Sequence, residues 1–136
     1  MKLFIDSAFF VALMDKSDKY HKITKDWFSS NADKFIFMTN NFVIAETITF
    51  LRCKVGYREA KEFGEKFRHS NLVKTEWMDI YLEKKAWELF QKYADKKDLS
   101  YVDCLSFACM KEDRISHALT FDKHFKQVGF TTLPLI

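Results

Sequence analysis

The sequence has few of the residues that divide a chain into loops and modules. Its 136 residues include one proline, Pro134, and three glycines, Gly56, Gly64 and Gly129. Without proline- or glycine-rich stretches, nothing indicates a linker, an internal repeat or a low-complexity tract. The 48% hydrophobic and 30% charged residues are typical of one domain that can bury its own core. We therefore interpret residues 1–136 as a single domain.

Long apolar runs are also missing. No stretch approaches the length needed to cross a bilayer, and Lys2 and Asp6 interrupt the first residues before the apolar part of a secretory signal could form. We expect a cytoplasmic protein with no membrane partner. The net charge of +3 and the isoelectric point near 8.7 permit binding to a polyanion without requiring it.

Cysteine and histidine are too sparse to support a soft metal site. Cys53, Cys104 and Cys109 are an odd set without a Cys-x-x-Cys pair, and their mostly apolar neighbourhoods predict reduced thiols in the core. The four histidines, which are His21, His69, His117 and His124, form no close pair of the kind that binds zinc. Any bound metal should therefore be a hard cation with oxygen ligands.

Five short apolar runs have the length of β-strands and are separated by longer helical patterns. They are Leu3–Ile5, Phe35–Met38, Leu72–Thr75, His117–Thr120 and Phe130–Leu133. Apolar residues recur at helical spacing from Tyr57 to Phe67 and from Leu82 to Tyr93. The alternation predicts an α/β fold with a central parallel sheet of four to five strands, covered by helices on both faces.

Local signals place two further helices. Ser17 or Asp18 is a suitable N-cap for a helix from Lys19 to Ser29. Gly56 follows a predicted helix from Asn41 to Val55, where a left-handed residue would end it. The many aromatic residues fall mostly on apolar stripes and are interpreted as core, with a surplus for a dimer or partner surface; they include Phe9, Phe10, Trp27, Phe28, Phe42, Phe50, Trp77 and Trp87.

Four acidic residues occur in apolar rather than lysine-rich surroundings. Asp6 ends the first strand, Asp122 follows another, and Glu46 and Asp103 lie inside predicted helices among hydrophobic residues. Burying an unpaired carboxylate costs several kcal/mol or raises its pKa. No well-placed lysine or arginine lies one helical turn away from Glu46 or Asp103, and Arg52 is badly phased relative to Glu46. A shared cation is the simplest explanation.

The topology allows these four acids to converge. The carboxyl ends of parallel strands meet at one edge of a sheet, where ligand crevices form, and two helices would bring Glu46 and Asp103 over that edge. An oxygen-only site with few protein ligands suits Mg²⁺, with Mn²⁺ as a substitute. The alternative reading of Asp6 or Asp122 taken singly is a helix N-cap.

The chain resembles the PIN-domain nucleases, and in particular the VapC-type ribonuclease toxins of prokaryotic toxin–antitoxin pairs. The resemblance spans nearly the whole chain. It rests on Leu3–Ser7, Ala45–Thr47, Leu99–Phe107 and Leu119–Phe125, of which the last two are the most specific. Ala8 is a departure, because many relatives have a small polar residue there.

The resemblance implies a Mg²⁺-dependent endoribonuclease that leaves 5′-phosphate and 3′-hydroxyl ends. It makes Asp6 and Asp103 the main metal ligands, with Glu46 and Asp122 completing an acidic quartet. Ser7, Ser100 and Thr120 would orient carboxylates or waters, with local capping as the alternative. It also implies an RNA substrate, a cognate antitoxin that covers the pocket and a homodimer.

Phosphate-binding residues are harder to assign. The basic residues near the acid-bearing segments are Arg52, Lys54, Arg58, Lys123 and Lys126, and we select Arg52 and Lys123 as substrate contacts. His124 is interpreted as a surface or packing residue. Two other functions stay open: an RNA-processing PIN nuclease without an antitoxin, and a catalytically silent RNA-binding PIN module. A haloacid dehalogenase-type phosphatase fits poorly, because Ala8 stands where that family has a second aspartate.

Overall fold

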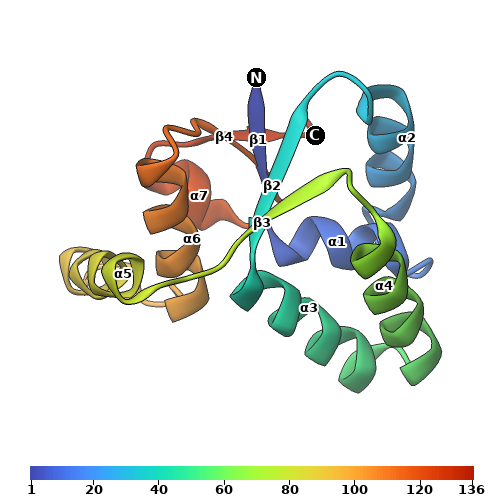
Figure 1. Ribbon diagram of the computed structural model, residues 1–136, viewed down its shortest axis with the longest axis horizontal. Coiled ribbons are helices and arrows are strands. Elements are labelled where there is room, and N and C mark those ends of the chain that lie inside the picture. The colour runs from blue at the N-terminus through green and yellow to red at the C-terminus, as the bar shows by residue number, and fades with distance from the viewer.

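The computed structural model describes residues 1–136, and a single five-stranded parallel sheet runs through its centre (Figure 1). The strands are β1 Lys2–Ile5, β2 Ile36–Asn40, β3 Val73–Glu76, β4 His117–Leu119 and β5 Thr131–Leu133. Their order across the sheet is β3-β2-β1-β4-β5, and all four neighbouring pairs are parallel. All five predicted strands are confirmed to within two residues at each end.

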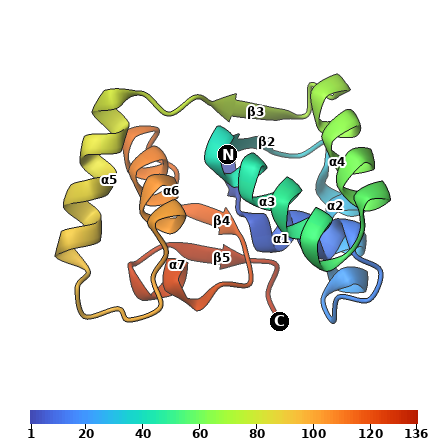
Figure 2. The ribbon, with the colours of Figure 1, turned by 90° about the horizontal axis from the view of Figure 1, so that it is seen from below.

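Seven helices surround the sheet. They are α1 Ser7–Met14, α2 His21–Asn31, α3 Asn41–Lys54, α4 Tyr57–His69, α5 Ile80–Lys92, α6 Tyr101–Glu112 and α7 Lys123–Gln127. Figure 1 shows α5, α6 and α7 on one side of the sheet and α1, α2 and α4 on the other, as predicted. The same two groups of helices stand apart in Figure 2, which looks at the molecule from below. None of the helices has the length and apolar character needed to cross a membrane.

The central strands are apolar without alternation because the sheet is covered on both faces. Leu3, Phe4 and Ile5 of β1 are all essentially inaccessible to solvent. They belong to one cluster of 21 buried residues that also includes Phe9 of α1 and Phe107 of α6. Ile5 pairs with Leu119 in the parallel register, so β1 and β4 end side by side at the same edge of the sheet.

Two helix boundaries differ from the prediction. Helix α3 ends at Lys54 with Val55 as its C-cap, and Gly56 is extended at the N-cap of α4, not left-handed. Helix α2 begins after Tyr20, which has no side-chain cap. Asp18 instead accepts a hydrogen bond from the Tyr20 N–H (2.8 Å), so it closes the turn one step before the helix. Gly56 and Asp18 therefore do lie at helix boundaries, but neither has the predicted role of a left-handed C-terminal residue or a helix N-cap.

The prediction that cysteines and aromatic residues are core was only partly right. Cys104 and Cys109 are buried, but Cys53 is exposed on α3. Phe9 and Phe10 are buried, whereas several other aromatic side chains are 40% to 75% exposed; these include Phe42, Phe50, Trp77 and Trp87. Aromatic stripes on helices therefore also mark surfaces of this molecule, in addition to its core.

Candidate active site

Asp6 and Thr120 meet where β1 and β4 end. The Asp6 N–H donates to the Leu119 carbonyl (3.1 Å), which continues the pairing of the two strands by one residue. The Thr120 hydroxyl then donates to Oδ2 of Asp6 (2.8 Å) and accepts from the Asp122 N–H (3.0 Å). Thr120 is 2% exposed and Asp6 is 3% exposed. The threonine therefore fixes the Asp6 carboxylate and the loop that carries Asp122.

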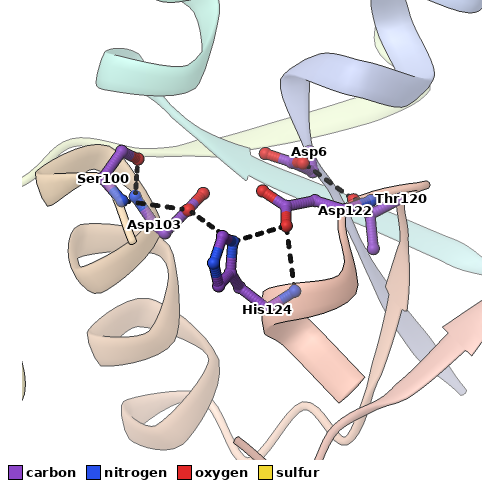
Figure 3. A network of polar contacts seen from close by, with 6 residues as sticks. All are labelled: Asp6, Ser100, Asp103, Thr120, Asp122 and His124. Atoms are coloured by element: carbon purple, nitrogen blue, oxygen red, sulfur yellow. Dashed lines mark hydrogen bonds and ion pairs between the residues drawn. The ribbon is translucent and has the colours of Figure 1, made fainter. Parts of the chain in front are cut away.

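The capping alternative is wrong for Asp6. Asp6 occupies the N-cap position of α1, but its side chain makes no cap hydrogen bond to the helix. A carboxylate at this position normally accepts from a backbone N–H two or three residues later. Here it is turned toward Asp103 of α6 and Asp122, the N-cap residue of α7, instead (Figure 3).

Asp103 is held on the first turn of α6 by a capping box with Ser100. The Ser100 hydroxyl accepts from the Asp103 N–H (3.0 Å), and Oδ2 of Asp103 accepts from the Ser100 N–H (3.3 Å). The Asp103 carboxylate is thus oriented by the backbone of Ser100, and the Ser100 hydroxyl serves the local cap. Asp103 is 6% exposed and faces Asp122 (Figure 3).

His124 is the residue that the sequence interpretation missed. It is 6% exposed, and its Nδ1 lies 2.7 Å from Oδ1 of Asp122 and 3.9 Å from Oδ2 of Asp103. The same Oδ1 accepts from the His124 N–H (2.9 Å), so Asp122 does cap α7. The imidazole is therefore a member of the acidic cluster, not a surface or general packing residue. The buried i, i+2 Asp-His pair after a strand was the available signal.

Glu46 approaches the cluster from α3. It is half-buried, and its charge is among those that act on Asp103. Together with Ser7 and Asp122 it lines a surface hollow of about 390 Å³. Asn40, buried at the N-cap of α3, accepts from the Val43 N–H (2.8 Å), and this cap positions the helix that carries Glu46.

Among the basic side chains, only His124 contacts the carboxylates. The protein contains no ion pair between any lysine or arginine and Asp6, Glu46, Asp103 or Asp122. Burial, reinforced by the charge of Asp103, raises the pKa of Asp6 to about 7. Burial, reinforced by Asp122 and Glu46, raises the pKa of Asp103 to about 6. The site therefore concentrates acidic groups whose ionised forms no lysine or arginine of the chain offsets.

This arrangement fits a hard divalent cation. Ligand atoms of Asp103, Asp122 and His124 all lie within 4.8 Å of one another, and Asp6 faces the same space (Figure 3). His124 Nδ1 already contacts Asp122, so the atoms left to coordinate a metal are carboxylate oxygens. Oxygen donors and uncompensated negative charge suit Mg²⁺ or Mn²⁺.

The predicted basic residues lie outside the cluster. The Arg52 guanidinium lies over the Tyr57 ring, 4.9 Å from its centroid, in a separate hollow between α3 and α4. Lys123 is exposed on the first turn of α7, directly after Asp122. Lys54, Arg58 and Lys126 are also exposed. The Ser7 side chain makes no hydrogen bond, and only its backbone N–H contacts Asp6.

Known proteins are similar to this chain in sequence and in fold. A family model described as "PIN domain" matches residues 3–131. The 23S rRNA-specific endonuclease VapC20 of Mycobacterium tuberculosis is 34% identical over 128 residues, which cover 94% of this chain and 95% of the relative. The crystal structure of that species' VapC20, a sarcin-ricin loop cleaving toxin, has a TM-score of 0.87 at 32% identity and covers 95% of this chain and 96% of its own.

More distant structures share the fold alone. VapBC2 from Rickettsia felis, bound to a DNA fragment from its promoter, has a TM-score of 0.74 at 12% identity, with 98% of both chains covered. FitAcB from Neisseria gonorrhoeae has a TM-score of 0.71 at 13% identity, with 98% of this chain and 97% of the other covered.

The chain belongs to the PIN-domain family, whose fold is that of nucleases. Within that family it is a VapC-type protein, as its sequence identity over nearly the full length of VapC20 establishes. The resemblance seen in the sequence is confirmed.

Proposed function

We propose that this chain is a Mg²⁺-dependent endoribonuclease, active also with Mn²⁺, that serves as the toxin of a VapBC-type pair. The observation that carries the proposal is the convergence of Asp6, Asp103 and Asp122 from three separate elements without a lysine or arginine partner. Acids that burial and mutual repulsion shift in pKa cluster at functional sites. The 34% identity to a named endonuclease supports the same conclusion.

In this proposal Asp6 and Asp103 hold the metal, with Asp122 and Glu46 completing its surroundings. The ion supplies Lewis acidity, which promotes ionisation of an attacking water and offsets charge on the phosphate. The chain's own residues fix the geometry. Thr120 holds Asp6, the Ser100 N–H holds one oxygen of Asp103, and His124 holds one oxygen of Asp122. For Asp103 and Asp122, the second carboxylate oxygen makes no hydrogen bond within the chain and is free for binding.

RNA is the proposed substrate, and ribosomal RNA is the first to test. VapC20 is named for cleavage of 23S rRNA at the sarcin-ricin loop. Sequence-specific recognition of RNA usually targets loops, whose bases can be splayed out and stacked on protein side chains. Lys123, exposed beside Asp122, and Arg52 remain proposed phosphate contacts.

Two protein partners accompany the proposal. An antitoxin would cover the acidic site, and an arginine is the side chain best suited to pair with its carboxylates. A homodimer would cover the apolar side of α5, where Ile80 is 75%, Tyr81 51% and Trp87 51% exposed. We propose the cytoplasm as the location, since both the ribosome and a co-expressed antitoxin are found there.

The direct test is cleavage of a 23S rRNA sarcin-ricin stem-loop by the purified protein. We expect cleavage with Mg²⁺ or Mn²⁺, none with EDTA, and a loss of at least about 100-fold for Asp6→Asn. Asp95→Asn, whose side chain is 75% exposed and belongs to neither the acidic cluster nor the hollow beside it, is the matched control and should cleave normally. Undiminished cleavage in EDTA, or products with cyclic phosphate ends, would contradict the metal mechanism.

The cellular role needs a separate test. Expression of the chain should arrest growth, and Asp103→Ala should relieve the arrest. Co-expression of the protein encoded directly upstream should relieve it as well. Cleavage without growth arrest would favour an RNA-processing nuclease, and RNA binding without cleavage would favour a silent RNA-binding module.

A further inference from the structure

The hollow next to the acidic cluster combines carboxylates with aromatic rings. Its volume is about 390 Å³, within the range of pockets that hold small ligands. We call it the aromatic hollow, and it is lined by parts of α1, α3, the α1–α2 connection and the β4–α7 connection. The lining residues that matter here are Lys19, Tyr20, Glu46, Phe50, Phe121 and Asp122.

A column of parallel rings, anchored in the core, reaches the hollow. Phe9, which is fully buried, lies parallel to Phe121 with ring centroids 6.5 Å apart. Phe121 in turn stacks on Tyr20 at 4.1 Å and an interplanar angle of 12°. The Lys19 ammonium lies 4.8 Å from the centroid of the Tyr20 ring. This wall of the hollow is therefore rigid and ends in a positive charge.

Phe50 supplies a ring that has no aromatic partner in the protein. It lies on α3, one helical turn after Glu46, and is 44% exposed. A half-exposed phenylalanine costs free energy in water unless something covers it. Its position beside the acids means that whatever covers it also lies beside the reacting phosphate.

We infer that the aromatic hollow binds one unpaired nucleobase of the RNA substrate, adjacent to the cleaved phosphodiester, with Phe50 as its stacking surface. This inference rests on the proposed function. A nucleobase fits because aromatic rings stack on any base, and a nearby lysine offsets the phosphate charge. Glu46 and Asp122 also line the hollow, so a base bound there lies next to the acids. An apolar protein side chain would fill the hollow without interacting with Lys19.

The test compares three variants on the stem-loop RNA that the wild type cleaves. Phe50→Leu keeps an apolar side chain but removes the ring, and we expect kcat/KM to fall at least about fivefold, the lower bound for one stacked base. Phe50→Tyr keeps the ring and should restore most of the activity. The matched control is Phe42→Leu, on the same helix and 41% exposed, which does not line the hollow and should cleave normally.

A second arm locates the base. Removing the base, but not the ribose, from each nucleotide flanking the cleaved bond should slow the wild type at one position by a similar factor. Phe50→Leu should lose nothing further at that position. Equal abasic penalties in both proteins, or a Phe50→Leu enzyme no slower than Phe42→Leu, would overturn the inference while leaving the proposed function intact.

Two further outcomes are distinguishable. If the wild type cleaves no RNA with Mg²⁺ or Mn²⁺, the proposed function fails and this inference fails with it. If Phe50→Leu cleaves RNA at the wild-type rate but binds the C-terminal peptide of the antitoxin more weakly, the hollow belongs to the protein partner and the inference is overturned. Circular dichroism melts of all variants establish that each is folded.

Discussion

The Nδ1 atom of His124, in the first turn of α7, lies 2.7 Å from Oδ1 of Asp122, the N-cap residue of that helix. The same carboxylate oxygen caps the helix by accepting from the His124 backbone N–H. Two donors on one oxygen leave Oδ2 of Asp122 free of hydrogen bonds within the chain. The imidazole therefore orients an acid of the cluster, in the way that outer groups orient metal ligands.

His124→Leu should weaken binding of Mn²⁺ about 10- to 100-fold, because Asp122 loses the side-chain donor that orients it. His124→Asn places an amide donor close to the position of Nδ1 and should restore most of the affinity. Isothermal titration calorimetry in the absence of RNA measures this directly. Equal affinities for the Leu and Asn variants would show that the side-chain hydrogen bond is not what matters.

Thr120→Val removes the hydroxyl that donates to Asp6 while keeping the side-chain volume. We expect metal affinity and kcat to fall about 10- to 100-fold, since Asp6 is then free to rotate. Thr120→Ser, which keeps the hydroxyl, is the control and should stay within a few-fold of the wild type. A Val variant that binds Mn²⁺ normally would contradict an orienting role for Thr120.

The acidic cluster should make the metal-free protein less stable as the pH rises. Burial raises the pKa of Asp6 to about 7 and that of Asp103 to about 6 from 3.8, so the folded state retains protons that the unfolded chain has released. Their contribution is thus fully present below about pH 4 and is lost as the pH rises through 6 and 7. One pKa unit corresponds to about 1.4 kcal/mol, so the loss is on the order of 3 kcal/mol or more.

Urea unfolding in EDTA at several pH values measures this loss. Asp6→Asn cannot ionise, so its stability should exceed that of the wild type at pH 8 and approach it at pH 4.5. Mg²⁺ should raise the melting temperature of the wild type more at pH 8 than at pH 5.5, because it binds the ionised carboxylates. If the free energy of unfolding changes with pH in the same way for the wild type and Asp6→Asn, ionisation of Asp6 is not the cause of the pH dependence.

Ser100→Ala should destabilise the protein by about 1 kcal/mol, the usual cost of losing a helix N-cap. The Ser100 hydroxyl accepts from the Asp103 N–H, and the backbone contact to the Asp103 carboxylate does not need the side chain. Metal affinity should therefore change much less than stability. Ser30→Ala, at an exposed site on α2, is the control for stability. A large loss of Mn²⁺ binding in Ser100→Ala would show that the Ser100 hydroxyl also orients the Asp103 carboxylate.

The exposed face of α5 should hold two copies together. Ile80→Glu adds a charge where an apolar side chain is 75% exposed, so a dimer formed there should become a monomer, with the fold unchanged. Tyr57→Glu, on α4 and 59% exposed, is the control and should not change the mass. Light scattering after gel filtration measures the molar mass in solution. A wild-type protein that is already a monomer would exclude the dimer.

Much of the fold could be predicted because its signals are local. The run Leu3–Ile5 is apolar throughout because both faces of a parallel sheet are covered, and it forms β1 as predicted. Helices α4 and α5 followed from apolar periodicity. Gly56 was wrongly assigned a left-handed conformation, because glycine permits that geometry without requiring it. Phe50 and Trp87 were assigned to the core, although periodicity alone cannot tell a buried stripe from an exposed one.

By itself, the sequence determined which acids are out of place and which segments carry them, because a carboxylate in an apolar run is unfavourable wherever the chain folds. Only the tertiary structure decided how they are held. The Thr120–Asp6 contact joins residues 114 positions apart, and the assignment of His124 to the cluster depends on the packing of α7 against α6. Directions of side chains across such separations follow from the packing of the whole core, which no local pattern encodes.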